Sequence, residues 1–535
     1  GAQLKWSTDN DPSDGLNPIV SNIASQADSY YAYYYYADEN NYGPASDPVN
    51  FLKINCCGEK EDLVINGNQE IIQNQDIGNI FVKTGAVLTI KSILQFAENK
   101  GIYVERGAKL IIDHAKLSSC NPLTKWNGIK IAGEFIYFSG FPITTVELIN
   151  GASIENAKIA IDGLDNLELF GINYDFGGAK ISLSNSTINN CDIGIQFGPA
   201  YFDDLSNIDV SAFSNNNLAI SMIQNKGCEI KNTTFGGNDL DIKANTSSFL
   251  ADYNVFNGGI ELESLYPNFE GSTLINNEFV NIDESNIGIK IDAQSNATDF
   301  VIQNNIFYGV GILSMGELDF DIAKNDFYDG IVGVSISDSG DEVINDIENN
   351  NFVNNKYSNS IYGVNDIEFL TNCFESIDEY SIELYHDASV HITQGNQFNS
   401  AGNCFQNSIP LVTGDNTGYF DYYTKEPFTF LQSCKNPGTG NFGVQQASIE
   451  SLSDNCGTGI NIFGSIPPRY RDCNYYNFTD LKQMIVTLRS EIKRIESATN
   501  ISLWVKKWLI AKHKRCLDRW IKLGSKDIME NLGKD

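Results

Sequence analysis

Carboxylates two residues apart are the clearest candidates for chemistry in this sequence. Leu318-Asp319-Phe320-Asp321-Ile322 alternates apolar and acidic residues, and a period of two sends Asp319 and Asp321 to one face of a strand. Two carboxylates this close repel each other, and a hard divalent cation such as calcium, which prefers oxygen ligands, would relieve the repulsion. The pattern therefore makes Asp319 and Asp321 candidate metal ligands.

A second candidate pair is spread over two successive repeats. Asp241 lies in Leu240-Asp241-Ile242 and Glu261 lies before Leu262 in a similar phrase. If the repeats stack as strands, equivalent positions are about 4.8 Å apart, and we predict that Asp241 and Glu261 form a second outward acidic column that binds the same kind of cation. Solvation and screening by salt are the competing interpretation, because no Asp-x-Asp-x-Asp-Gly loop marks a dedicated calcium site. Calcium is the only cofactor considered.

These residues are positioned by a short phrase, Asn-x-Phe, that returns throughout the middle of the chain. Its successive phenylalanines are 20 to 28 residues apart, and self-similarity at a fixed period of about 20–50 residues is typical of a solenoid. A disordered polar tract is the alternative for an Asn-rich sequence, but here the apolar residues keep the period. The phrase begins at Asn254, Asn277, Asn305, Asn325, Asn350, Asn372 and Asn396.

Between these phrases a small residue precedes an apolar-x-apolar pattern, as in Gly288-Ile289-Lys290-Ile291. Alternation rich in Ile, Val and Phe indicates that each coil consists of strands. We therefore predict a mainly β protein whose central part, residues 61–410, is one right-handed parallel β-helix of about 13–16 rungs. The phenylalanines should form an inward column, and the asparagines should line one corner with their amides bonded from rung to rung.

Three other regions lack the repeat. Residues 1–60 are a strand-rich lead-in that resembles the end of a fibronectin III-like sandwich, and its tyrosine run 30–36 is either a packed strand or a glycan-stacking surface. Residues 411–477 are expected to be terminal strands that cap the coil. Residues 478–535 have a helical period and predict a basic helical hairpin, with a membrane-surface helix as the alternative.

The charge of the chain is strongly negative and unevenly distributed. Its 535 residues include 36 Lys and Arg against 68 Asp and Glu, a net charge of −32, and the basic residues concentrate after residue 465. An acidic body repels phosphate backbones, so nucleic acid is not an expected partner. No apolar run reaches the roughly 18 residues of a membrane-spanning helix, so no transmembrane segment is predicted. The chain begins at Gly1 without a signal peptide, and we expect a removed leader or a piece of a longer protein.

The eleven cysteines do not decide the redox compartment, because no Cys-x-x-Cys motif occurs. Cys191, Cys373 and Cys404 lie inside the repeats and are interpreted as small buried hydrophobic residues. Better candidates for disulfides, whose pairing stays open, lie near the end of the coil at Cys434, Cys456 and Cys473.

Several features occur together along the chain. They are Gly-Ala-x-Leu-x-Ile coils at 85–90 and 107–112, Trp126-x-Gly128-Ile129, the Asn-x-Phe rungs, a Tyr-rich passage before Cys434, Cys456-Gly457 and a basic helical pair. In combination they resemble the large secreted β-helix proteins of Bacteroidetes bacteria over about residues 60–524. The resemblance implies type IX secretion and a place outside the cell or on its surface. The sorting domain typical of that family does not occur in this chain.

Right-handed β-helices also carry polysaccharide lyases and hydrolases, so the motifs of such enzymes are relevant. Polygalacturonase-type hydrolases combine paired aspartates with Gly-His-Gly and Arg-Ile-Lys motifs, and neither of these two motifs is present. Arg106 is the only arginine within residues 61–410, which disfavours a lyase that needs a basic residue. The sequence therefore assigns no catalytic residue. The histidines are His114, His386, His391 and His513.

Taken together, the sequence favours a non-catalytic extracellular module of a large bacterial surface protein, either an adhesin or part of a filament. Its expected partners are other copies or modules of the same surface assembly and cell-surface glycans. The alternative is a polysaccharide-degrading enzyme, a lyase or a glycoside hydrolase, with its site on the face of the β-helix. Of the two, the reading that the chain is not an enzyme is preferred.

Overall fold

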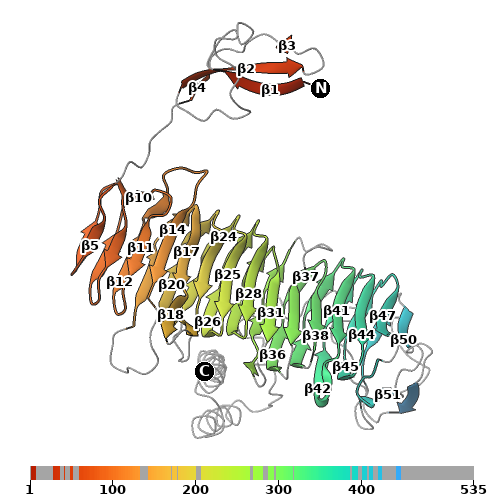
Figure 1. The fold of residues 1–535 in the computed structure, drawn as a ribbon. Helices are drawn as coiled ribbons and strands as arrows, with labels where there is room; N and C mark the ends of the chain where they lie inside the picture. The colour runs from red at the N-terminus through yellow and green to blue at the C-terminus, as the bar shows by residue number, and fades with distance from the viewer. Residues whose placement is uncertain are drawn as a thin grey trace, which may run out of the picture. The chain divides into compact units, whose positions relative to one another are not determined.

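The chain divides into two compact units, Gly1–Lys60 and Glu61–Asp535, in a computed structural model (Figure 1). The first unit contains an antiparallel sheet in which β2 pairs with the other three strands. The tyrosine run lies in β2. The strands are β1 (Ala2–Ser7), β2 (Asp28–Tyr36), β3 (Asn41–Tyr42) and β4 (Val49–Phe51). The structure describes residues 2–7, 28–36, 41–42, 49–51, 60–132, 143–169, 172–177, 179–199, 206–264, 269–280, 287–293, 297–316, 318–385, 388–395, 401–406, 409–413, 420–424 and 442–446.

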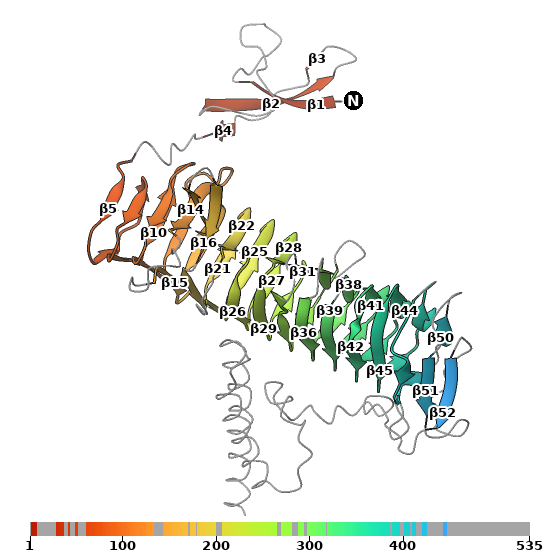
Figure 2. The same cartoon turned by 60° about the horizontal axis from the view of Figure 1, so that its bottom comes forward.

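The second unit is a parallel β-helix built from three long parallel sheets, and successive turns of the chain add strands to all three along most of the coil (Figures 1 and 2). Sheet 1 has 15 strands, which agrees with the predicted number of rungs. They are β5 (Leu63–Ile65), β8 (Ile80–Val82), β11 (Gly101–Val104), β14 (Trp126–Ile131), β17 (Ala157–Gly163), β22 (Ile193–Phe197), β25 (Leu218–Ile223), β28 (Leu240–Asn245), β31 (Ile260–Ser264), β35 (Ile289–Ala293), β38 (Ile312–Met315), β41 (Val332–Ser337), β44 (Tyr357–Tyr362), β47 (Tyr380–Leu384) and β50 (Ile409–Thr413).

Sheet 2 follows sheet 1 in each turn and carries the residues discussed below as a site. One of its strands, β32, pairs with β36 beside the main path of the sheet. Its strands are β6 (Gln69–Ile71), β9 (Val87–Ile90), β12 (Lys109–Asp113), β15 (Thr145–Ile149), β20 (Lys180–Ser184), β23 (Asn207–Asp209), β26 (Lys226–Lys231), β29 (Ser248–Asp252), β32 (Phe269–Glu270), β33 (Thr273–Ile275), β36 (Ala297–Gln303), β39 (Leu318–Ala323), β42 (Gly340–Glu348) and β45 (Asn365–Leu370).

Sheet 3 closes each turn and contains the Asn-x-Phe phrase. Its strands are β7 (Gln75–Ile77), β10 (Ile93–Phe96), β13 (Lys116–Ser119), β16 (Ser153–Glu155), β21 (Thr187–Asn189), β24 (Ala212–Ser214), β27 (Thr234–Gly236), β30 (Val255–Phe256), β34 (Glu278–Phe279), β37 (Ile306–Tyr308), β40 (Asp326–Tyr328), β43 (Asn351–Val353), β46 (Cys373–Glu375) and β49 (Cys404–Gln406).

Two smaller sheets complete the second unit. One is an antiparallel hairpin, and the other is a three-stranded sheet in the order β48-β51-β52. Over the described ranges the chain forms no helix, and none therefore qualifies as a membrane-spanning helix. The predicted helical hairpin, 478–535, lies outside the described residues. The remaining strands are β18 (Asp165–Leu169), β19 (Ile172–Phe176), β48 (Thr393–Gln394), β51 (Phe420–Thr424) and β52 (Phe442–Gln446).

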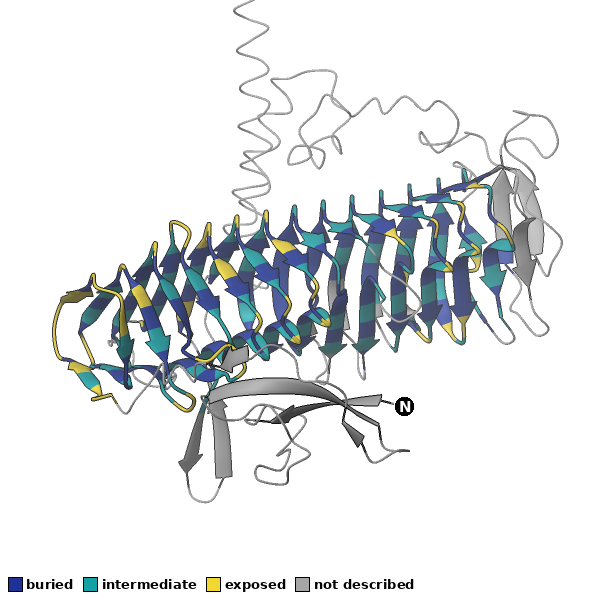
Figure 3. Ribbon diagram, turned by 90° about the horizontal axis from the view of Figure 1, so that it is seen from above, coloured by how far each residue is buried: buried dark blue, intermediate teal, exposed yellow. Residues whose placement is uncertain are grey.

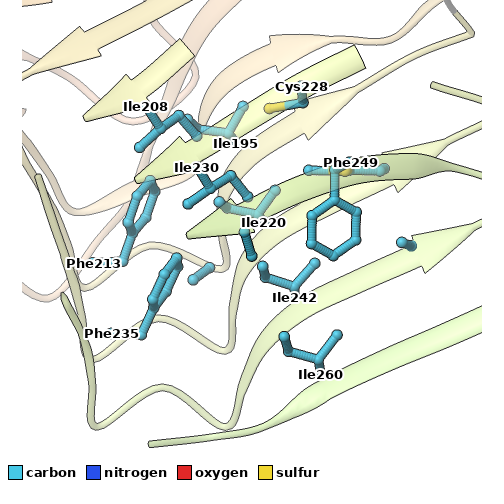
Figure 4. Packing of buried hydrophobic residues seen from close by; sticks show 14 of the residues in the cluster. Ile195, Ile208, Phe213, Ile220, Cys228, Ile230, Phe235, Ile242, Phe249 and Ile260 are labelled. Atoms are coloured by element: carbon cyan, nitrogen blue, oxygen red, sulfur yellow. The ribbon is translucent and has the colours of Figure 1, made fainter. Parts of the chain in front are cut away.

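Buried and partly exposed residues alternate along the strands of the coil (Figure 3). The inner face of sheet 3 holds a column of phenylalanine rings that are 0–1% exposed. Neighbouring rings are stacked with centroids 4.6–5.2 Å apart, and Figure 4 shows two of them beside the core isoleucines. The column consists of Phe213, Phe235, Phe256, Phe279, Phe307, Phe327, Phe352, Phe374 and Phe405.

The C-terminal end of this column differs from the prediction. Phe405 pairs with Phe374 in register, and their ring centroids are 5.0 Å apart. The predicted member, Phe398, lies outside the described residues. Asn403-Cys404-Phe405 is a second Asn-x-Phe phrase seven residues after the first, and it is the one that stacks on the rung below.

An asparagine ladder runs along the corner between sheets 2 and 3, as predicted. Asn325 Oδ1 accepts hydrogen bonds from the backbone N–H (2.9 Å) and the side-chain amide (3.0 Å) of Asn305, while Asn305 Nδ2 also donates to the carbonyl of Leu274 (2.9 Å). The same pattern repeats at each rung, so every buried amide satisfies the backbone of its neighbours. The ladder comprises Asn254, Asn277, Asn305, Asn325, Asn350, Asn372 and Asn403.

The left-handed turn at this corner is made by the residue before each ladder asparagine. Asn276 and Asn304 have φ angles of 57° and 56°, and Asn349 has 55°. Short polar side chains tolerate this conformation better than bulky ones. The ladder residue itself supplies the hydrogen bonds, so two neighbouring residues share the work of forming this corner.

The cysteines inside the repeats do not share one role. Cys191 is buried with a free thiol, as predicted. Cys373 and Cys404 are disulfide-bonded, as is Cys120, so interpreting Cys373 and Cys404 as small hydrophobic residues was wrong. Their repeat position alone does not distinguish a packed thiol from a disulfide. The candidates after residue 430 lie outside the described residues.

Candidate active site

β39, β42 and β45 are successive strands of sheet 2 near the C-terminal end of the coil (Figure 2). Their outer face carries acidic side chains. On β39, Phe320 and Ile322 are 3% and 1% exposed, whereas Asp319 and Asp321 are partly exposed. The alternation predicted for these four residues is confirmed. The side chain of Leu318 lies outside the described residues.

The strand register brings residues together that are far apart in the sequence. Asp321 pairs with Asp346, and Asp346 pairs with Glu368. The backbone N–H of His391 donates to the carbonyl of Ile367 (3.2 Å), which places the histidine on the next rung above Glu368. Since successive rungs are about 4.8 Å apart, Asp321, Asp346, Glu368 and His391 form one outward column, called the acidic column below.

Two further carboxylates flank the acidic column. Asp319 precedes Asp321 on β39, and Asp366 precedes Glu368 on β45. The Nδ1 atom of His391 is 2.6 Å from Asp366 Oδ1, and its Nε2 atom is 4.0 Å from Glu368 Oε1. The side chains of His391, Asp366 and Glu368 are 18%, 20% and 21% exposed. The imidazole ring therefore lies between two carboxylates and is largely withdrawn from water.

The surroundings of the column raise the pKa of two of its carboxyls and so favour their protonated forms. Burial raises the pKa of Asp346, the negative charges of the two aspartates on β39 raise it further, and His391 lowers it. Burial also raises the pKa of Glu368, where His391 lowers it and the charges of Asp346 and Asp366 raise it. A carboxyl that keeps its proton beside carboxylate neighbours is the arrangement that general acid–base catalysis requires.

Basic side chains are missing from the strands that carry the column. None of β36, β39, β42 and β45 contains a lysine or an arginine. The amide of Gln303 donates a hydrogen bond to Asp321 Oδ2. The column therefore concentrates negative charge and hydrogen-bond acceptors, and it is suited to bind hydroxyl groups and to move protons.

An aromatic pair lies at the end of the neighbouring sheet 1 strands, four residues before Asp366. The rings of Tyr362 and Tyr385 are stacked with centroids 4.0 Å apart, and Tyr362 is 37% exposed. Burial raises the pKa of Glu383 on β47, and a hydrogen bond with Tyr385 lowers it. Exposed rings beside hydrogen-bonding carboxylates are features of surfaces that bind amphipathic ligands.

Asp241 does not lie on the outer face, contrary to the prediction. Its side chain is 0% exposed, and its carboxylate accepts hydrogen bonds from the backbone N–H of Asn257 (2.8 Å) and Gly258 (2.6 Å) and from Asn238 Nδ2 (2.9 Å). Burial raises the pKa of Asp241 to about 6 although these hydrogen bonds oppose the effect. Asp241 is the second residue of β28, and the equivalent residue of β25 on the rung below, Ala219, is also buried.

Glu261 lies on the outer face, but in a different column from Asp241. It pairs with Lys243 and Lys290 in register, and its carboxylate oxygens are 3.4 Å and 3.1 Å from the two Nζ atoms. Burial alone would raise the pKa of Glu261, but the hydrogen bonds and charges of the lysines outweigh it and hold the pKa below its ordinary value. The predicted pairing of Asp241 with Glu261 is wrong.

The proposed binding of calcium stays a prediction. Within the ranges that the structure describes, no group of three or more His, Cys, Asp or Glu side chains has an arrangement suited to hold a metal ion. Asp319 and Asp321 share an outer face as expected. Asp241 and Glu261 do not share a site.

Sequence reasoning missed Asp346, Glu368 and His391 as members of one column. A signal existed, because Asp346-Ile347-Glu348 and Asp366-Ile367-Glu368 repeat the acidic-apolar-acidic pattern of β39. The register could not be read from it, since β42 contains a bulge between Gly340 and Asn345, which breaks the simple count of residues per turn.

The described residues of the second unit thus define a parallel β-helix with a cluster of ionisable groups on its outer face. No protein-family model and no curated protein matches the sequence. A family 28 exopolygalacturonase of Yersinia enterocolitica is a solved structure to which the chain is similar, with 8% identity over 81% of this chain and 85% of the other, and a TM-score of 0.21.

This comparison corrects the function expected from the sequence. The favoured expectation was a non-catalytic adhesive or structural module, whereas the matched structure is a polysaccharide-degrading enzyme. The alternative named from the sequence was an enzyme acting on polysaccharide. At this TM-score the similarity transfers no residue role, so the function is argued from the acidic column itself.

Proposed function

We propose that the chain is a glycoside hydrolase that cleaves a polysaccharide at the acidic column of sheet 2. The observation that carries the proposal is the pair Asp346 and Glu368, which lie on adjacent rungs and whose pKa values are both raised by burial. Hydrolysis of a glycosidic bond needs two carboxyl groups, one of which enters the reaction protonated. Adjacent outward carboxyls with raised pKa values meet that need.

The reaction would use the two carboxyls in turn. One protonated carboxyl gives its proton to the glycosidic oxygen while the bond from the anomeric carbon to that oxygen breaks. The other, as a carboxylate, attacks the anomeric carbon and forms a glycosyl ester. Water then attacks the same carbon, gives a proton back to the first carboxylate, and releases the sugar and the second carboxylate. Both carboxyls end in their starting states.

The spacing of the rungs predicts the stereochemical outcome. Carboxyls of retaining glycosidases are about 5–5.5 Å apart and those of inverting enzymes about 6.5–9.5 Å apart. Neighbours in the acidic column are separated by one rung, about 4.8 Å along the stack, so Asp346 and Glu368 fit retention. The exposed ring of Tyr362, near the column in the chain, gives a sugar ring an aromatic surface on which to pack.

The setting of the enzyme belongs to the same proposal. We place it outside the cell, in the manner of the secreted Bacteroidetes β-helix proteins, with glycan and further modules of the same protein as partners and without nucleic acid. The disulfide-bonded Cys120, Cys373 and Cys404 support this, because disulfides persist in oxidising compartments. The right hand of the coil, the sandwich-like lead-in and the helical hairpin also remain proposals.

The test is release of reducing ends from a panel of soluble polysaccharides by the whole chain. Wild-type protein should release reducing ends from at least one member, with retention of anomeric configuration by proton NMR. Asp346→Asn, which keeps the shape but removes the proton donor, should lower kcat by at least about 10²-fold.

Glu147→Gln is the matched control, because Glu147 lies on the outer face of the same sheet and is paired with Lys109 (2.7 Å). It should keep wild-type activity. Equal activity of wild type and a folded Asp346→Asn variant on every substrate that is cleaved would contradict the proposal.

A further inference from the structure

His391 is the only member of the acidic column whose side chain can carry a positive charge. Its backbone N–H bonds to Ile367, so the residue continues the register of sheet 2 beyond β45. Gln394 holds the segment in place, since its Nε2 atom donates to the carbonyls of Ile367 (2.8 Å) and His391 (3.2 Å) and its Oε1 atom accepts from the N–H of Phe369 (2.7 Å). The ring is therefore carried by a clamped segment of backbone.

Asp366 determines how the ring is turned. A carboxylate can only accept, so the 2.6 Å contact from Asp366 Oδ1 requires a proton on Nδ1 of His391. The opposite nitrogen, Nε2, then faces Glu368 Oε1 at 4.0 Å. When the imidazole takes up a second proton, that proton is on Nε2 and points at the Glu368 carboxylate.

The two candidate catalytic carboxyls face different neighbours. Around Glu368 stand Asp346 on the rung below, Asp366 on the same strand and His391 on the rung above. Around Asp346 stand Glu368 above and Asp321 below, with Asp319 beside Asp321 on the same strand, and the charge of His391 also acts on Asp346 from two rungs above. Glu368 is thus in contact with the potential cation, and Asp346 lies between carboxylates.

We propose that His391, turned by Asp366, is a positioning residue that keeps Glu368 ionised, so that Glu368 attacks the anomeric carbon and Asp346 donates the proton. The inference rests on the proposed hydrolase function and assigns the roles within it. His391 lowers the pKa of both Glu368 and Asp346, against burial and neighbouring carboxylates that raise them. The contact of Nε2 with Glu368 at 4.0 Å is what distinguishes Glu368 from Asp346. The proton on Nε2 stays with the imidazole and is not transferred to substrate.

The first test measures charge and does not depend on activity. The pKa of Glu368 is followed by carbon NMR of carboxyl-labelled glutamate in the whole chain, with the signal assigned from Glu368→Gln. His391→Gln removes the cation and should raise the pKa of Glu368 by at least about 0.5 pH units, while His391→Lys, which keeps a cation, should leave it at or below the wild-type value. A residue that only fills space would give the same shift in both variants.

The second test follows the ring itself. The chain has four histidines, so nitrogen NMR of labelled histidine rings can resolve His391. Wild type should carry its neutral-form proton on Nδ1, and Asp366→Asn should move part of the population to Nε2. An unchanged tautomer would show that Asp366 does not orient the ring and would overturn the inference.

Kinetics separate this inference from the proposed function. The acid limb of the pH profile of kcat/KM should move to higher pH in His391→Gln, kcat should fall, and KM should stay within about twofold. If the pKa of Glu368 is the same in wild type and His391→Gln, the inference is wrong even where the chain cleaves glycan. If the pKa moves as expected and no polysaccharide is cleaved, the assigned charge stands and the proposed hydrolase function is wrong.

Discussion

Charged residues on the outer face of the β-helix are arranged in two different ways. From β8 to β35, several acidic side chains are paired with lysines on neighbouring rungs, as in Lys109 with Glu147 and Lys130 with Asp162, both at 2.7 Å. On β39, β42 and β45 carboxylates follow one another with no lysine in the strands. We call the first stretch the ion-paired region and the second the acidic region.

The difference shows that parallel stacking does not by itself determine the charge of a column. The same rung spacing brings opposite charges together in one region and like charges together in the other. Like charges on adjacent rungs repel by about 1 kcal/mol in water and by more where water is partly excluded. A scaffold gains nothing from that arrangement, and destabilising constellations of this kind are typical of functional sites.

The core should be the same in both regions, and this prediction carries the largest effect. Phe327 in the acidic region and Phe235 in the ion-paired region are 0% and 1% exposed and stacked on their neighbours. Replacing either by Ala should lower the free energy of unfolding by about 3–5 kcal/mol in chemical denaturation. A near-zero effect at one site only would mean that the two regions differ inside as well as outside.

Asp241 is an inward carboxylate on β28, within the ion-paired region, and it should make stability depend on pH. Its pKa rises to about 6 on folding, so folding favours the protonated form. The associated stability is present below the pKa of the unfolded chain, about 4, and is lost as pH rises through 6, a change of about 3 kcal/mol at about 1.4 kcal/mol per pH unit. In the Asp241→Asn variant, this decrease in the free energy of unfolding between pH 4 and 6 should disappear. An unchanged slope would contradict the assignment.

The asparagine ladder should stabilise the coil by a smaller amount. Asn350 Oδ1 accepts from the backbone N–H and the amide of Asn325, and Asn350→Ala would leave these buried donors unsatisfied at a cost of about 1–3 kcal/mol. Asn217→Ala is the control, because Asn217 is exposed and its loss should change stability by less than about 0.5 kcal/mol. Equal denaturation midpoints for the two variants would show that the asparagine ladder does not stabilise the coil.

Substitution of an outward carboxylate should have the smallest effect on folding stability, and this effect should differ between high and low pH. Because the pKa of Asp346 is raised on folding, its charge destabilises the fold above that pKa and has no effect on stability below the pKa of the unfolded chain. Asp346→Asn should therefore stabilise the protein by about 1 kcal/mol at pH 8 and should leave it nearly unchanged at about pH 3, below the pKa of the unfolded chain. Thermal unfolding at both pH values measures this, and destabilisation at pH 8 would show that the column is a structural support.

Much of the fold follows from local pattern. The Asn-x-Phe phrase predicts the stacked core because one phenylalanine per turn must face inward for the coils to close. The pattern was insufficient where two phrases compete, since Phe398 and Phe405 both fit and only the stacking partner, Phe374, decides between them. It was also insufficient near the start of sheet 1 strands, where two successive residues such as Asp241 and Ile242 of β28 are buried and the period of two does not apply.

The site was less predictable than the fold, for a physical reason. Asp319 and Asp321 are two residues apart and their common face follows from strand geometry. Asp346, Glu368 and His391 join them only through the register of three further turns, and each turn has its own length and a bulge can shift it. The acidic strands can therefore be predicted from the sequence, but the register that aligns them cannot.

The central claim is that the acidic column serves catalysis while the ion-paired region serves stability. It is tested most directly by measuring polysaccharide cleavage and thermal unfolding at pH 8 on two matched variants of sheet 2. We predict that Asp346→Asn raises the unfolding temperature and loses activity, whereas Glu147→Gln, which breaks the contact with Lys109, lowers the unfolding temperature slightly and keeps activity. Full activity in a stabilised or unchanged Asp346→Asn variant would contradict the account.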